Sequence, residues 1–242
     1  MRTLLLIICL LVFYNNSSSQ DKSVEFVNNL NSYGLTYIHE TNLTSLGGKP
    51  EGTLSYDDVI GSAFWDDKWQ KAIIVCGQNK IFTVQKVKLN LYSNDVYYID
   101  DKGRQLVVSN VVNKVLFYSD EDSTKPSAVF EKFSSLEGAD NTGFYQSLNA
   151  GNTKLLKLTT VKIESGLDPL LGKTIHRFSS KYHYSIYFNN TVNTIYKLNK
   201  DNILKLINPA DEIKSWLKTN NNQLKNEAQV ITFFEYYNVS TK

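Results

Sequence analysis

Side chains that commonly carry catalysis or hold metals are few in this sequence and widely spaced. Its three histidines are His39, His176 and His183, and their separations match no zinc-binding pattern. His183 alternates with Tyr182 and Tyr184 along a strand-like stretch, so it faces solvent if the two tyrosines face the core. We therefore predict no metal site and no histidine chemistry.

Cysteine and serine nucleophiles have equally little support. Cys76 lies in the apolar run of residues 72–76, with no histidine nearby in sequence to act as its base, so we expect a buried, unreactive thiol. The sequence contains no Gly-x-Ser-x-Gly motif, glycine-rich phosphate loop or dinucleotide fingerprint. We predict no catalytic residue and no cofactor, which favours a protein that is not an enzyme. An enzyme assembled from residues distant in sequence is the alternative.

Acidic residues are clustered, which leaves turns and calcium binding as alternatives. The clusters are Asp57-Asp58, Asp66-Asp67, Asp100-Asp101 and Asp120-Glu121-Asp122. A calcium loop needs several oxygen ligands at alternate positions, whereas adjacent aspartates in a strand point to opposite sides. We therefore expect these residues to form turns.

Aromatic residues form the most informative pattern for binding. Trp65, Asp67 and Trp69 would share one face of a strand, and exposed aromatic rings beside polar groups are suited to holding sugars or peptides. These three are the candidate ligand-binding residues. Aromatic residues are also preferred in strands and cores, so a purely structural role is the alternative. The same alternatives apply to a long series of tyrosines, Tyr97, Tyr98, Tyr145, Tyr182, Tyr184, Tyr187 and Tyr196.

The elements that position these residues are mainly strands. Residues 71–76, 81–92, 96–99 and 105–108 alternate like strands and are joined by short turns, so they are expected to be neighbours in an antiparallel meander. Further strands are expected at residues 114–118, 128–133, 144–150 and 154–163, before a hairpin that turns at Asn189-Asn190. Between residues 164 and 174 we expect a loop that folds Leu167, Leu170 and Leu171 back onto the sheet.

The last forty residues change to a helical period. We expect Asn208 to cap a helix that has Pro209 at its first position. We also expect Asn226 to cap a final helix, with Gln229 three residues later. That helix places Val230, Phe233, Phe234 and Tyr237 on one apolar face, which must pack on the sheet. The predicted fold class is α+β, mainly β: an antiparallel β-meander, as a curled sheet or partly closed barrel, with a C-terminal helical tail.

The N-terminus predicts export. Arg2 precedes an apolar run from Leu4 to Phe13 that is too short to span a membrane and is followed by polar residues. We expect residues 1–20 to be a signal peptide cleaved near Gln20, with an uncleaved anchor as the alternative. Residues 21–61 would form an irregular lead-in, 62–198 the antiparallel β domain, and 199–242 helices packed on it. The mature protein would be periplasmic, cell-surface or secreted, without a transmembrane segment.

Charge excludes some classes of partner. The 242 residues carry 26 basic and 24 acidic side chains, a net charge of +2, spread along the chain. That balance is not typical of a protein that binds nucleic acid or an anionic membrane. The length fits one domain, and Cys76 alone in the mature chain excludes an internal disulfide.

The sequence resembles a family of exported β-rich proteins of Bacteroidota that has no assigned activity. The similarity lies in residues 61–70, 87–96, 200–206 and 233–238. It implies an envelope or secreted location and a β-meander with a helical tail, and it implies no catalytic residues.

Together these features predict a non-catalytic binding or interaction module of the cell envelope or secreted fraction. Its partner would be a glycan, a peptide or another envelope protein. The alternative is a carrier of an apolar small ligand, because a curled meander can enclose a cavity that the helical tail closes. An empty apolar interior would favour the carrier, and a filled core with aromatic residues outside would favour the module.

Overall fold

The computed structural model describes residues 37–39, 55–77, 80–134, 136–140, 142–170 and 172–241, with only the backbone of 37–39 and of Asp57. The signal peptide expected at residues 1–20 lies outside them. The strands are β1 Tyr37–His39, β2 Val59–Ile60, β3 Gln70–Cys76, β4 Ile81–Asn90, β5 Asp95–Ile99, β6 Gln105–Val108, β7 Val112–Tyr118, β8 Ala128–Glu131, β9 Tyr145–Ser147, β10 Lys154–Asp168, β11 Lys173–Phe188 and β12 Thr191–Ile195. A 3-10 turn, η3 (Tyr56–Asp58), precedes β2, and the helices are α1 Lys200–Ile207, α2 Asp211–Thr219 and α3 Glu227–Ser240.

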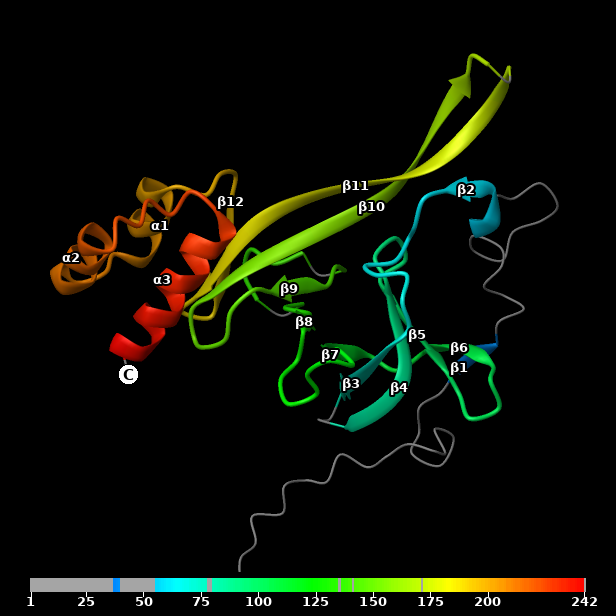
Figure 1. Ribbon diagram of the computed structural model, residues 1–242, viewed down its shortest axis with the longest axis horizontal. Coiled ribbons are helices and arrows are strands. Elements are labelled where there is room, and N and C mark those ends of the chain that lie inside the picture. Colours follow the sequence, from blue (N-terminus) through cyan, green and yellow to red (C-terminus); the bar gives the residue numbers. More distant parts are fainter. Residues whose placement is uncertain are drawn as a thin grey trace, which may run out of the picture.

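All the described strands belong to one large, open sheet, and the predicted mainly β fold is confirmed (Figure 1). The order is β1-β6-β5-β4-β3-β7-β8-β9-β10-β11-β12, with β2 paired to β11 off this path. The β2–β11 pair is parallel and the other pairs are antiparallel. Asn94 and Gly103 take the positive φ that the predicted turns between β4, β5 and β6 require.

The first half of the sheet must curl. In the strand order, β6 and β7 are four spacings apart, which is about 19 Å in a flat sheet. Only residues 109–111 connect Val108 to Val112, and four Cα–Cα steps cannot reach beyond about 15 Å. Curling brings the end of β6 to the start of β7 while the sheet stays open. Packed side chains from these strands fill the core between them, among them Ile74, Leu89 and Phe117.

The second half is dominated by the long β10–β11 hairpin, whose far half projects from the rest of the molecule (Figure 1). The prediction of a loop at residues 164–174 is wrong. β10 continues to Asp168 and β11 begins at Lys173, and Leu167 and Leu170 are 71% and 94% exposed instead of folded back. Gly166 pairs with Ile175 within the ladder, and Pro169 and Gly172 lie in the turn of this two-stranded ribbon, where such residues are common. Leu171 lies outside the described residues.

The helical tail packs as expected. Val230, Phe233, Phe234 and Tyr237 of α3 are buried with Leu155 of β10 and Ile186 of β11 in one apolar cluster. Asn226 caps α3 by accepting a hydrogen bond from the Gln229 backbone N–H, and the Gln229 side chain accepts one from Lys225 N–H. Within the described residues, no helix combines the length and apolar character needed to cross a membrane.

Two local expectations need correction. Asn208 ends α1 in the left-handed conformation (φ 38°) and does not cap α2, which begins after Ala210 without a side-chain cap. Asparagine suits both positions, so its type alone does not decide between them. In the range 21–61, expected to be irregular, the structure has β1 paired with β6, η3, and β2 paired with β11.

Candidate functional site

The structure places the three predicted ligand-binding residues in separate environments. Residues 61–69 form bends with one isolated bridge, from Phe64 to Asn90, and β3 begins only at Gln70. The strand face that Trp65, Asp67 and Trp69 were expected to share is therefore absent.

Each of the three has its own contacts. The Trp65 ring packs into the core, with its centroid 5.0 Å from that of Phe117. Asp67 is exposed and accepts a hydrogen bond from Ser62 Oγ at 2.5 Å. The Trp69 ring is half-buried under the Lys88 amine, 4.9 Å from its centroid. Ligand binding by these residues remains a prediction without the geometry that motivated it.

The acidic pairs form turns, as predicted. Asp66, Asp100 and Asp122 each accept a hydrogen bond from the backbone N–H two residues later, which is the geometry of an Asx turn. Among the described residues, no three His, Cys, Asp or Glu side chains are grouped closely enough to hold a metal ion.

The remaining candidates for chemistry are dispersed. Cys76 is buried on β3, as expected, and burial raises the pKa of its thiol to about 11. His176 lies on the projecting hairpin with its Nδ1 2.7 Å from Ser165 Oγ. His183 is half-buried on β11 instead of open to solvent, and the His39 side chain lies outside the description.

A wide groove lies between β11, the segment after β12 and the start of α3. Figure 1 shows where these elements lie in the fold. We call it the tyrosine groove; its volume is about 940 Å³. Its lining residues are Tyr182, His183, Tyr184, Tyr196, Lys197, Leu198, Lys225, Asn226, Glu227 and Ala228. Of the tyrosines in the predicted series, Tyr97, Tyr98 and Tyr145 are core residues, whereas Tyr182 and Tyr196 are 58% and 99% exposed.

Strand geometry explains how the groove presents its rings. Tyr182 and Tyr184 are two residues apart on β11 and therefore project from the same face, with ring centroids 5.6 Å apart at 70°. Lys157 is the direct partner of Tyr184 across the β10–β11 pair. Its amine lies 4.4 Å from the Tyr182 ring centroid, in position for a cation–π contact.

The start of α3 completes the site with a carboxylate. Glu227 Oε1 accepts hydrogen bonds from Tyr184 Oη at 2.6 Å and from Lys157 Nζ at 2.9 Å. Glu227 is the first residue of α3, after the Asn226 cap, where the helix dipole favours a negative charge. Two lining residues of the groove, Tyr184 and Glu227, thus form an ordered cluster with Lys157.

The electrostatics of this cluster keep Glu227 ionised. Burial would raise the pKa of its carboxyl, but the hydrogen bonds from Tyr184 and Lys157 outweigh burial and lower it. Burial and the adjacent carboxylate raise the pKa of Tyr184 above its ordinary value, so Tyr184 stays a hydrogen-bond donor. Both groups hold fixed charge states at neutral pH.

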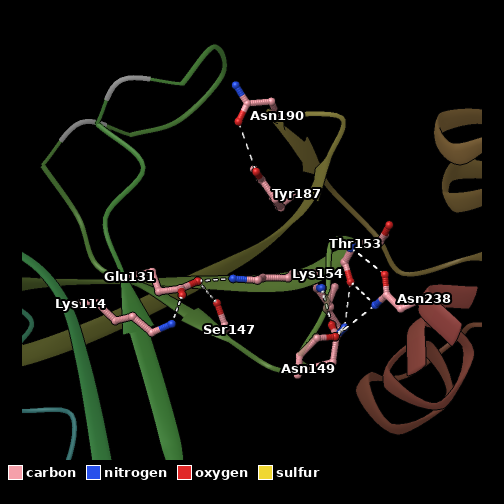
Figure 2. A network of polar contacts seen from close by, with 11 residues as sticks. Lys114, Glu131, Ser147, Asn149, Thr153, Lys154, Tyr187, Asn190 and Asn238 are labelled. Atoms are coloured by element: carbon pink, nitrogen blue, oxygen red, sulfur yellow. Dashed lines mark hydrogen bonds and ion pairs between the residues drawn. The ribbon is translucent and has the colours of Figure 1, made fainter. Parts of the chain in front are cut away.

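A second polar cluster lies away from the groove and is structural (Figure 2). Glu131 is buried and accepts from Lys114, Lys154 and Ser147 at 2.6 to 2.7 Å. Burial would raise the pKa of Glu131, but these bonds lower it to about 2. A buried charge with three such partners stabilises the junction of β7, β8, β9 and β10.

Figure 2 also shows how α3 is fastened to the sheet. Asn238 accepts a hydrogen bond from Thr153 N–H at 2.8 Å and donates to the carbonyls of Thr153 and Ala150. The turn before β10 approaches α3 closely: a Cβ on Gly151, whose φ is 108°, would lie 2.4 Å from Asn238 Nδ2. This contact holds the C-terminal end of α3 against the turn before β10.

Sequence reasoning identified the groove tyrosines only as members of a long series and missed Lys157 and Glu227. Lys157 and Glu227 are 70 residues apart, and neither belongs to a local motif. The available signal was Asn226, whose role as a helix cap places Glu227 in the first turn of α3.

Comparison of the chain with protein-family models, with curated proteins and with solved structures gave no match. The resemblance to exported proteins of Bacteroidota therefore stays a prediction.

Proposed function

We propose that the protein is a non-catalytic binding module and that the tyrosine groove holds an acidic glycan. The observation that carries this proposal is the pairing of two exposed tyrosine rings with the ordered cluster of Lys157, Tyr184 and Glu227. Flat aromatic rings stack on the C–H faces of sugar rings, and fixed donors and acceptors beside them bond to sugar hydroxyls.

The charge of the groove favours an acidic ligand. Lys157 is neutralised by Glu227, whereas Lys197 and Lys225 at the rim are exposed and have no ion-pair partner among the described residues. Two free ammonium groups suit a glycan that carries carboxylate or sulfate groups.

The carboxylate of the groove supports a role in binding a glycan over a role in hydrolysing one. Glycosidases commonly use two carboxyl groups about 5 to 9.5 Å apart, one of which has a raised pKa. Glu227 is the one carboxylate among the described lining residues, and its pKa is lowered. The filled core of the curled sheet likewise supports a binding module over a carrier of apolar ligands.

The test is calorimetric titration with acidic and neutral oligosaccharides of matched length. We expect acidic oligosaccharides to bind more tightly, and Tyr196→Ala to weaken binding about tenfold because one stacking contact is lost. Tyr196→Phe should retain most of the affinity because the ring remains. Leu170→Ala, at an equally exposed apolar residue outside the groove, is the matched control. Equal affinities of Tyr196→Ala and the unmodified chain would exclude the groove as the binding site.

A further inference from the structure

A second hollow lies at the C-terminal end of α3, whereas the tyrosine groove lies at the N-terminal end of this helix. The turn before β10, the end of β11 with the turn that follows it, and the end of α3 surround a pocket of about 360 Å³. We call it the asparagine pocket, after Asn152, Asn189 and Asn190, which line it. Its volume is within the range of small-molecule sites.

Two side chains that are almost completely buried line this pocket with hydroxyl groups that lack a partner. Thr153 is 3% exposed and Tyr237 is 9% exposed. Within the described residues, Thr153 Oγ1 and Tyr237 Oη make no hydrogen bond, and both oxygens remain accessible. Most buried polar side chains have a hydrogen-bond partner. Two that lack one at the same pocket therefore point to a ligand that bonds to them.

The contacts of its backbone hold Thr153 in place (Figure 2). Asn238 accepts from Thr153 N–H and donates to Thr153 C=O, each at 2.8 Å. Asn149 donates a further hydrogen bond of 2.8 Å to the same carbonyl. Tyr237 precedes Asn238 in α3 and packs in the apolar cluster between the helix and the sheet. Both side chains are therefore ordered before a ligand binds, which reduces the entropic cost of binding.

The chemistry of the pocket is polar but uncharged. None of its described lining residues carries a formal charge, whereas the tyrosine groove has two free lysines at its rim. Hydroxyl and amide groups both donate and accept hydrogen bonds. Asn190 Oδ1 accepts from Tyr187 Oη at 3.2 Å, and its Nδ2 group makes no hydrogen bond within the described chain. Tyr187 and Phe188 add apolar ring surface. This combination suits a neutral sugar, which has hydroxyl groups and apolar C–H faces.

We propose that the asparagine pocket binds one unit of a neutral sugar, and that the hydroxyl groups of Thr153 and Tyr237 bond to hydroxyl groups of that unit. The asparagine amides supply further donors and acceptors around it. This site goes beyond the proposed acidic-glycan site and does not depend on it. The two sites lie at opposite ends of α3 and differ in charge, so either can fail without the other.

The test is titration of the protein with glucose, galactose, mannose and N-acetylglucosamine, followed by NMR. The backbone amide signals of Thr153, Asn189 and Asn190 report on the pocket. We expect at least one of the four sugars to shift these signals in a saturable way. The matching uronic acid, which has a carboxylate on the same ring, should bind the pocket more weakly, because no described lining residue is cationic.

Two variants remove the hydroxyl groups and keep the shapes of the side chains. Thr153→Val and Tyr237→Phe should each weaken sugar binding about fivefold, because each removes one hydrogen bond to the ligand. Neither hydroxyl group bonds within the described chain, so both variants should keep the unfolding midpoint of the unmodified protein. Thr160→Val on β10 and Tyr236→Phe on α3 are matched controls outside the pocket and should bind like the unmodified protein.

The outcomes that contradict the proposal are distinct. It is overturned if none of the four sugars gives a saturable shift, if both variants bind as tightly as the unmodified protein, or if the controls share the loss. A variant set in which binding and the unfolding midpoint fall together would assign the two hydroxyl groups to the stability of the fold. That result would overturn the proposal as well.

Discussion

At the scale of single residues, Glu131 shows how a buried charge links stability to pH. Its carboxyl has a pKa of about 2 in the folded protein against an ordinary value of 4.5. Because the folded pKa is the lower one, the stabilisation is fully present above pH 4.5 and is lost as the pH falls from 4.5 toward 2. Over that window it amounts to about 3 kcal/mol.

We therefore predict that Glu131→Gln lowers the free energy of unfolding at pH 7 by about 3 kcal/mol, because Lys114 and Lys154 lose their carboxylate. The variant should also lose most of the dependence of stability on pH between 4.5 and 2. Chemical denaturation across this pH range measures both effects. Glu121→Gln, at an exposed acid, is the control and should behave like the unmodified chain.

At the scale of elements, α3 is a helix that the sheet stabilises. Phe234 is completely buried between α3 and the sheet, whereas its neighbour Glu235 is exposed. A helix of 14 residues is marginal in water on its own, so burial of its apolar face must hold it in place.

We predict that Phe234→Ala lowers the free energy of unfolding by about 3–5 kcal/mol, because it leaves a cavity in the core. Glu235→Ala should change it by less than about 0.5 kcal/mol. Thermal unfolding of the two variants side by side makes the comparison. Equal midpoints would mean that α3 adds nothing to the core.

Helices and strands could be predicted where the local sequence pattern fits only one structure. The meander of β3 to β6 follows from connections too short for any other arrangement, and the cap of α3 follows from Asn226 and Gln229. Predictions were wrong where a residue fits two structures. Asn208, for example, suits either end of a helix. A loop was expected between residues 164 and 174, although a hairpin accommodates Gly166 in a strand and Pro169 in its turn.

At the scale of the whole molecule, the features that sequence reasoning missed depend on distant contacts. β7 pairs with β3, and β2 pairs with β11. No periodicity in the sequence predicts either pairing. The candidate site has the same character, because Glu227 reaches Lys157 only when α3 packs on β10. Ligand binding by Trp65, Asp67 and Trp69 stays a prediction, but the strand face that they were expected to share is absent. Their spacing was treated as a strand where the chain bends around the core.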